Sequence, residues 1–221
     1  MRNLLAIATI LLLAPTAVLA AEPWEVVKDS DGVKVWMQET GPRGLPVLRA
    51  RTRINASVID VLAVITDIGP SCEWAGRCVE ERLIERPDML HTRMYSRRKG
   101  PWPLDDRDFE LETSGVISNG GARVLIRFHT AAKARTPLPS GTVRMPVMRG
   151  SYLLERAGQA TDITFRVEGD PGGWIPKWAI SWTAAAIPYE SLRALRKRVP
   201  KMRGRYVDVV RAFEKLAAAA P

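Results

Sequence analysis

The chain has 221 residues, of which 46% are hydrophobic and 26% charged, and its 33 Lys and Arg outnumber 24 Asp and Glu to give a formal net charge of +9. The apolar content excludes a disordered chain. Two His and two Cys are too few for a Cys/His zinc module or for a small domain held together by disulfides. A single compact, basic, globular domain remains, because a chain of this length can bury one good core.

The first twenty residues predict a secretory signal peptide. Arg2 precedes an apolar run from Leu4 to Leu13, and small residues lead to a cleavage point after Ala20 or Ala21. The apolar run is shorter than the ~20 residues that span a bilayer. We therefore expect residues 1–20 to be removed, residues 21–221 to form one domain, and the protein to be periplasmic.

The two cysteines lie six residues apart, at Cys72 and Cys78, with Gly76 able to bend the loop between them. Export to an oxidising compartment favours a local disulfide between them. Two buried or free thiols are the alternative, because the sequence does not supply the Cα–Cα distance that decides the matter. We expect no metal site.

The elements follow in chain order. Alternation of apolar and polar residues predicts strands over residues 33–38 and 47–54, and helical spacing predicts a helix over residues 57–68 with Asn55 as its N-cap. Asn119-Gly120 is a strong hairpin signal. Further strands are predicted over residues 79–85, 89–97, 107–117, 122–130, 150–156 and 161–168. Short turns between sequential strands imply an antiparallel sheet.

Two segments do not fit this pattern of strands and short turns. Residues 131–149 are too long and too rich in proline for a tight turn, and long irregular loops are usually functional or mobile. From Pro176 onward, helical spacing predicts one long helix with a kink at Pro188, followed by a short amphipathic helix over residues 206–216. The fold class is therefore α+β, with helices packed on one face of an antiparallel sheet.

Catalytic chemistry finds little support in the sequence. Both histidines, His91 and His129, fall in predicted strands outside any nucleophile motif, and the acidic clusters are explained by turn capping and ion pairing. No phosphate-binding glycine loop or dinucleotide fingerprint occurs. We expect no catalytic residues and no cofactor.

Basic residues are concentrated in two regions. No acid lies between Glu112 and Glu155, and seven basic residues without an acid lie between Glu190 and Asp208. Such regions attract phosphates, and export makes lipid headgroups a better target than nucleic acid. The alternative is a solvated basic face with no specific partner.

An aromatic stripe marks the long C-terminal helix. Trp178 and Trp182 share a face with Ala185 and Tyr189, and small residues interrupt the stripe. This pattern fits either a packed core or an apolar cavity between helix and sheet. Periodicity alone does not separate the two.

Four stretches in this order resemble the START (StAR-related lipid-transfer) family. They are residues 31–35 (DGVKV), 102–109 (WPLDDRDF), 149–152 (RGSY) and 170–178 (DPGGWIPKW), and the likeness runs from about residue 24 to 199. The resemblance implies the helix-grip fold of the SRPBCC superfamily. In that fold a curved antiparallel sheet wraps around a long C-terminal helix and encloses an apolar cavity for one lipid-sized ligand.

The resemblance also implies roles for individual residues. The residues expected to face the cavity are Trp178, Trp182, Ala185, Tyr189, Thr113 and Met94. The segment 131–148 corresponds to a gate that would dock on an anionic membrane, through Lys133, Arg135, Leu138, Arg144, Met145 and Met148. Arg107 and Asp108 are carried over as structural residues.

One departure from the family bears on the ligand. Some sterol-binding members carry an arginine six residues after the motif arginine, paired with an acid inside the cavity. Here the two positions are Thr113 and Met94, which argues against a sterol held by that ion pair. Phospholipid, fatty acid, hopanoid-like and other apolar ligands remain open.

The leading hypothesis is an exported, monomeric, non-enzymatic protein that binds and transfers a hydrophobic ligand at a membrane. An alternative is a helix-grip enzyme of cyclase or hydrolase type, with His129, Tyr152 or Asp108 as its candidates. A third is an interaction module that has a packed core and no cavity, and whose basic surface contacts an acidic partner.

Overall fold

The structure is a computed structural model that describes residues 23–40, 45–73, 75, 77–175 and 185–220. Its strands are β1 (Glu25–Ser30), β2 (Val33–Thr40), β3 (Leu45–Ile54), β4 (Cys78–Glu85), β5 (His91–Arg98), β6 (Asp106–Ser118), β7 (Arg123–Thr130), β8 (Thr142–Arg144), β9 (Val147–Ala157) and β10 (Ala160–Asp170). Its helices are α1 (Val58–Ile65), α3 (Ala186–Arg198) and α4 (Val207–Ala218), with short 3₁₀ turns η1 (Gly69–Glu73) and η2 (Val199–Met202).

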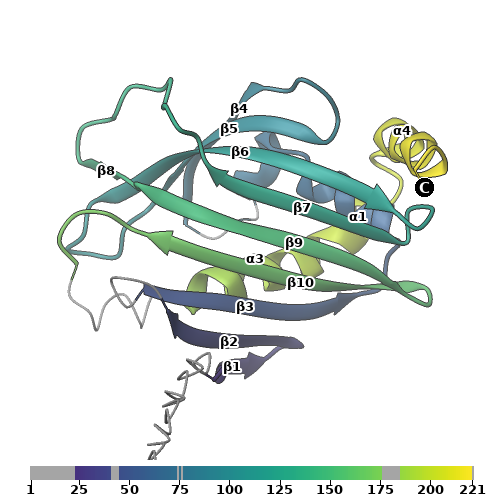
Figure 1. The fold of residues 1–221 in the computed structure, drawn as a ribbon, viewed down its shortest axis with the longest axis horizontal. Coiled ribbons are helices and arrows are strands. Elements are labelled where there is room, and N and C mark those ends of the chain that lie inside the picture. The colour runs from purple at the N-terminus through teal and green to yellow at the C-terminus, as the bar shows by residue number, and fades with distance from the viewer. Residues whose placement is uncertain (1–22, 41–44, 74, 76, 176–184, 221) are drawn as a thin grey trace, which may run out of the picture.

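The strands form one sheet in the order β1-β2-β3-β10-β9-β7-β6-β5-β4 (Figure 1). Neighbours in this order are antiparallel, and β8 adds a parallel pairing to the start of β6. The hairpin predicted at Asn119-Gly120 joins β6 to β7, with positive φ angles at both residues. The predicted α+β class with an antiparallel sheet is confirmed.

The inner face of the sheet is covered by helices. Val35, Ala50, Leu154 and Ile163 are at most 1% exposed on this face. α3 packs against β2, β3 and β10, and α1 packs against β7, β9 and β10. The two helices lie on the same side of the sheet (Figure 1), so the space they enclose with it holds the core.

The N-cap of helix α1 lies two residues later than the cap predicted from the sequence. Its N-cap is Ser57, whose side chain accepts a hydrogen bond from the backbone N–H of Asp60 at 3.1 Å. The prediction of Asn55 was therefore wrong. Both residue types favour an N-cap, and only the backbone path chooses between them.

The C-terminal part of the chain forms α3 and α4, and α4 confirms the short amphipathic helix predicted over residues 206–216. α3 begins at Ala186, so Pro188 lies in its first turn, where a missing N–H leaves no hydrogen bond unmade. The kink expected at Pro188 depends on the residues before Ala185, which lie outside the described residues. The stretch expected to precede it, with Trp178 and Trp182, lies outside the described residues. α4 packs against α1 and the β6 end of the sheet through Phe213 and Ala217.

Candidate ligand-binding cavity

A cavity of about 340 Å³ lies between the inner face of the sheet, α1 and α3. Leu62 and Ile65 of α1 close one side, and Ala186, Ile187 and Leu195 of α3 close another. The sheet contributes mainly large apolar side chains. They are Met94, Phe109, Leu111, Ile126, Phe128, Met148, Tyr152 and Phe165. The volume falls within the range of small-molecule sites, roughly 300–1,000 Å³.

The structure places the expected cavity-face residues in two groups. Met94 and Thr113 line the wall, and the hydroxyl groups of Thr113 and Thr92 lie 2.6 Å apart. Tyr189 instead donates its hydroxyl to Asp31 at 3.0 Å, on the β1–β2 turn. α3 is rotated relative to the expected stripe, because the lining uses the neighbouring positions, which are Ala186, Ile187, Glu190 and Ser191 in place of Ala185 and Tyr189.

Two arginines of the expected gate form ion pairs that the sequence did not predict. Met145 and Met148 line the cavity. Arg144 forms a 2.7 Å ion pair with the fully buried Asp108, and Arg135 forms one of 2.8 Å with Glu85. The sequence suggested a basic loop, whereas two of its arginines are neutralised by acids that the sheet brings across. Among the expected gate residues, exposed side chains are found at Arg135, Lys133 and Leu138.

Glu110 of β6 connects the segment 131–148 to the sheet through hydrogen bonds. Its side chain is 1% exposed, accepts hydrogen bonds from Arg93 at 3.0 and 3.1 Å, and accepts the backbone N–H of Arg135 at 2.9 Å. Burial alone would raise the pKa of Glu110. Hydrogen bonds from Thr136, Arg135 and Arg93 outweigh burial and lower the pKa to about 2. The segment expected to be irregular also contains β8.

A buried ion pair in the cavity wall was not predicted. Glu81 and Arg98 lie 3.0 Å apart, with side chains 5% and 26% exposed, and Ser71 donates its hydroxyl to Glu81. Burial raises the pKa of the Glu81 carboxyl despite the nearby Arg98. Register shifts in β4, between 78 and 80 and between 83 and 85, break the two-residue alternation. The sequence pattern therefore does not indicate which acid faces inward.

Cys72 and Cys78 are joined in a disulfide, with their Cα atoms 5.1 Å apart. Their sulfur atoms lie within 4.8 Å of a Glu81 carboxylate oxygen. Because metal ions bind thiolates, the bonded sulfurs offer no such ligand there.

The residues of the mid-chain motif hold loops together. Arg107 donates to the backbone carbonyl of Asp105 at 2.7 Å and also borders the cavity, and burial lowers its pKa. The carboxylate of Asp108 accepts two hydrogen bonds from Arg144. His129 is exposed on the opposite face of the sheet, whereas Tyr152 lines the cavity and stacks on Phe165 at 4.3 Å. Burial raises the pKa of Tyr152.

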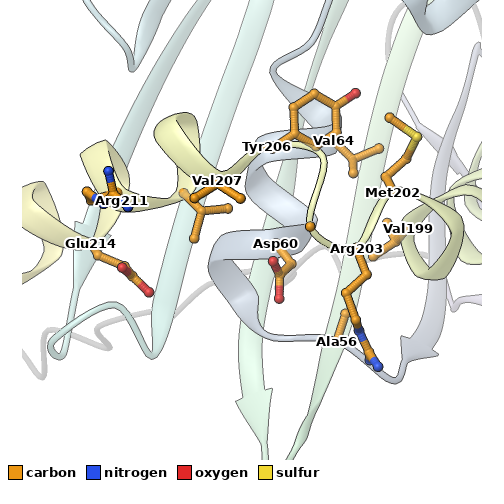
Figure 2. Close-up of a pocket in the computed structure, with 12 residues that line it drawn as sticks. Ala56, Asp60, Val64, Val199, Met202, Arg203, Tyr206, Val207, Arg211 and Glu214 are labelled. Carbon is orange, nitrogen blue, oxygen red and sulfur yellow. The ribbon is translucent and has the colours of Figure 1, made fainter.

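A smaller hollow of about 230 Å³ lies between α1, η2 and α4 (Figure 2). Val64 and Met202 form its buried apolar part. Its charged residues are two acids and two arginines, which are Asp60, Glu214, Arg203 and Arg211. The balance of charge favours neither an anion nor a cation, so the larger cavity is the candidate site. None of the helices in the described ranges is long and apolar enough to cross a bilayer.

The chain is similar in sequence to several known proteins. The chain matches none of the protein-family profiles. It is 31% identical over 182 residues to the uncharacterized protein PA1579 of Pseudomonas aeruginosa, covering 82% of this chain and 89% of that protein. It is 25% identical over 170 residues to bovine phosphatidylcholine transfer protein, covering 75% and 79%.

Two solved structures share the architecture. A STAR-related lipid transfer protein from Xanthomonas axonopodis has a TM-score of 0.73 and 26% identity, covering 80% of this chain and 98% of that chain. Human STARD10 has a TM-score of 0.73 and 22% identity, covering 86% and 78%. The fold and cavity define a helix-grip protein, as predicted. The chain belongs to the START domain family.

Proposed function

We propose that this protein is an exported, monomeric carrier without enzymatic activity, which binds one lipid or similar hydrophobic molecule in its cavity and exchanges it at an anionic membrane. The observation that carries the proposal is an apolar cavity of about 340 Å³ with a single buried ion pair in the described part of its wall. Two relatives are named as lipid transfer proteins, one of them for phosphatidylcholine.

The cavity suits an amphipathic ligand. Its methionine, leucine and phenylalanine side chains would cover an acyl or other hydrocarbon part. Glu81 and Arg98 supply an acceptor and a fork of donors at one place in that wall, which would hold a polar end.

Filling the cavity is the direct test. We expect Thr113→Trp to weaken ligand binding about tenfold or more, because a large side chain forced into an occupied space costs roughly 1–3 kcal/mol. Native mass spectrometry of the purified protein would measure the bound fraction. Ser114→Trp is the matched control, because Ser114 follows on the same strand and is exposed on the other face. Equal ligand occupancy in both variants would contradict a ligand in this cavity.

Membrane contact is proposed at the loops that border the cavity. Trp102 is 94% exposed and Trp174 is 83% exposed, and their neighbours Pro101, Leu104 and Ile175 line the cavity. Tryptophan favours the membrane–water interface. Lys133 and Leu138 of the segment 131–148 are exposed and would add a basic and an apolar contact.

Replacing Trp102 with alanine is expected to weaken binding to anionic vesicles about tenfold, since burying a large apolar side chain contributes roughly 1.5–3 kcal/mol. Co-sedimentation with vesicles measures the affinity. Leu216→Ala is the control, because Leu216 is 41% exposed on α4, beside the far end of β6. If Leu216→Ala weakens binding as much as Trp102→Ala does, the proposed contact is wrong.

Export rests on residues 1–20 and agrees with the disulfide between Cys72 and Cys78, since disulfides persist in oxidising compartments such as the periplasm. N-terminal sequencing of the protein from a periplasmic extract should find Ala21 or Glu22 first. The absence of enzymatic activity is supported by the placement of the candidates. His129 faces away from the cavity and Asp108 is held by Arg144, so an enzyme would depend on Tyr152.

A further inference from the structure

The outer face of the sheet, opposite the cavity, carries a cluster of arginines and tryptophans. Trp36 pairs with Arg49 across β2 and β3, and Arg49 pairs with Arg166 across β3 and β10. Arg51 lies two residues further along β3 on the same face. We call Trp24, Trp36, Arg49, Arg51 and Arg166 the arginine–tryptophan patch.

The guanidinium of Arg49 lies within cation–π distance of two indole rings. It lies 4.5 Å from the ring centroid of Trp24 and 4.8 Å from that of Trp36, and Arg166 lies 6.0 Å from Trp24. The Nε atom of Arg49 is buried and has no hydrogen-bond partner. Contacts with two indole rings restrict the orientation of this guanidinium, whose N–H groups donate in its own plane.

The three arginines of the patch form no ion pair with the residues that the structure describes, although the charge of Arg51 helps to lower the pKa of Asp162. Four neighbouring cations on the same face are ion-paired, as Lys34–Asp29, Arg53–Asp162, Arg149–Glu168 and Arg123–Glu155. Arg49 and Arg166 form no ion pair with any residue that the structure describes, and Arg51 donates to the hydroxyl of Thr164 at 3.2 Å. The acids nearest to the patch are therefore already engaged by other cations.

Placing like charges opposite each other destabilises a sheet. Burial, followed by the charges of Arg51 and Arg166, lowers the pKa of Arg49. An anion placed among the three guanidinium groups would attract each of them and offset their mutual repulsion. Arginine suits phosphate because its planar donors match two oxygens at once and because it is weakly hydrated.

We propose that Arg49, Arg51 and Arg166 form a binding site for a phosphate group on the outer face of the sheet, with Trp24 and Trp36 holding Arg49 in place. The phosphate belongs either to an anionic phospholipid headgroup or to free inorganic phosphate. The site lies on the face away from the cavity and does not depend on what the cavity binds.

The test uses the two tryptophans as reporters. Inorganic phosphate is titrated into the mature protein at constant ionic strength, and the indole N–H signals of Trp24 and Trp36 are followed by NMR after assignment with Trp→Phe variants. Phosphatidylglycerol vesicles form a second arm, with binding measured by co-sedimentation. We expect Arg51→Gln/Arg166→Gln to weaken binding about tenfold or more, because it removes two charged hydrogen-bond donors from the site. This double variant keeps both tryptophans that contact Arg49.

Arg53→Gln/Arg149→Gln is the matched control, since it removes the same charge from the same face but from ion-paired positions. A phosphate response that the control keeps and the patch variant loses supports a site that free phosphate can fill. A loss confined to vesicle binding supports the same site with a lipid phosphate as its ligand. Equal losses in both double variants, or no response in either arm, would overturn the proposal.

Discussion

Glu110→Ala is expected to lower the free energy of unfolding by about 3–5 kcal/mol, because it leaves the buried Arg93 without its main partner. Arg93 is 9% exposed and keeps only a half-exposed carboxylate, that of Glu112 at 3.1 Å, as an ion-pair partner. The backbone N–H of Arg135 also loses its acceptor. Urea unfolding at neutral pH measures the effect. Glu112→Ala is the control and should change stability by less than about 1 kcal/mol, because Glu112 is half-exposed and Arg93 keeps its pair with Glu110.

The same carboxylate predicts an acid dependence. The pKa of Glu110 falls from an ordinary 4.5 to about 2 in the folded protein. A lowered pKa contributes stability that is present above the unfolded value and is lost as the pH falls through the folded value. The stability gap between the protein and its Glu110→Gln variant should therefore narrow between about pH 4.5 and 2. A gap that stays constant over this range would contradict the role given to Glu110.

Sequence patterns predicted most of the sheet because its two faces differ in polarity. Alternation located β2, β3, β6, β7 and β10 where inner residues such as Val33 and Val35 are buried and Lys34 between them is not. β1 was missed because it is short, polar and bulged between Val26 and Lys28. β8 was missed because its three residues pair only with the distant start of β6.

The cavity was harder to predict residue by residue. The resemblance predicted Met94 and Thr113 at the cavity, and both line it. The stripe on the C-terminal helix predicted that Tyr189 faces the ligand, whereas its hydroxyl contacts the β1–β2 turn. The absence of acids near Arg144 in sequence suggested a free charge. Asp108 is 36 residues away in the chain and 2.7 Å away in space. Charge runs describe local composition, whereas ion pairs in a sheet join distant strands.

Arg98→Met should also lower the free energy of unfolding strongly at neutral pH, because it leaves the buried Glu81 without its cation. Loss of one partner of a buried pair costs about 3–5 kcal/mol. Burial already raises the pKa of Glu81, and without Arg98 the pKa rises further. A raised pKa gives stability below the unfolded value that is lost as the pH rises through the folded value. The stability of the variant should therefore be close to that of the parent at pH 4 and fall below it toward pH 7. Thermal unfolding at a series of pH values measures the difference.

Replacing both partners separates stability from ligand choice. Because exchange of a buried pair for neutral groups of similar size is often neutral or stabilising, Glu81→Gln/Arg98→Met should recover the stability that Arg98→Met loses. The double variant should still take up an uncharged lipid such as diacylglycerol, but its preference for phosphatidylcholine should fall about tenfold, the value of one charged hydrogen bond. Native mass spectrometry after competition between the two lipids measures this ratio. Arg53→Gln/Asp162→Asn, at an exposed ion pair on the outer face of the sheet, is the control. An unchanged lipid ratio with restored stability would assign Glu81 and Arg98 to the fold alone and leave the polar end of the ligand to other residues.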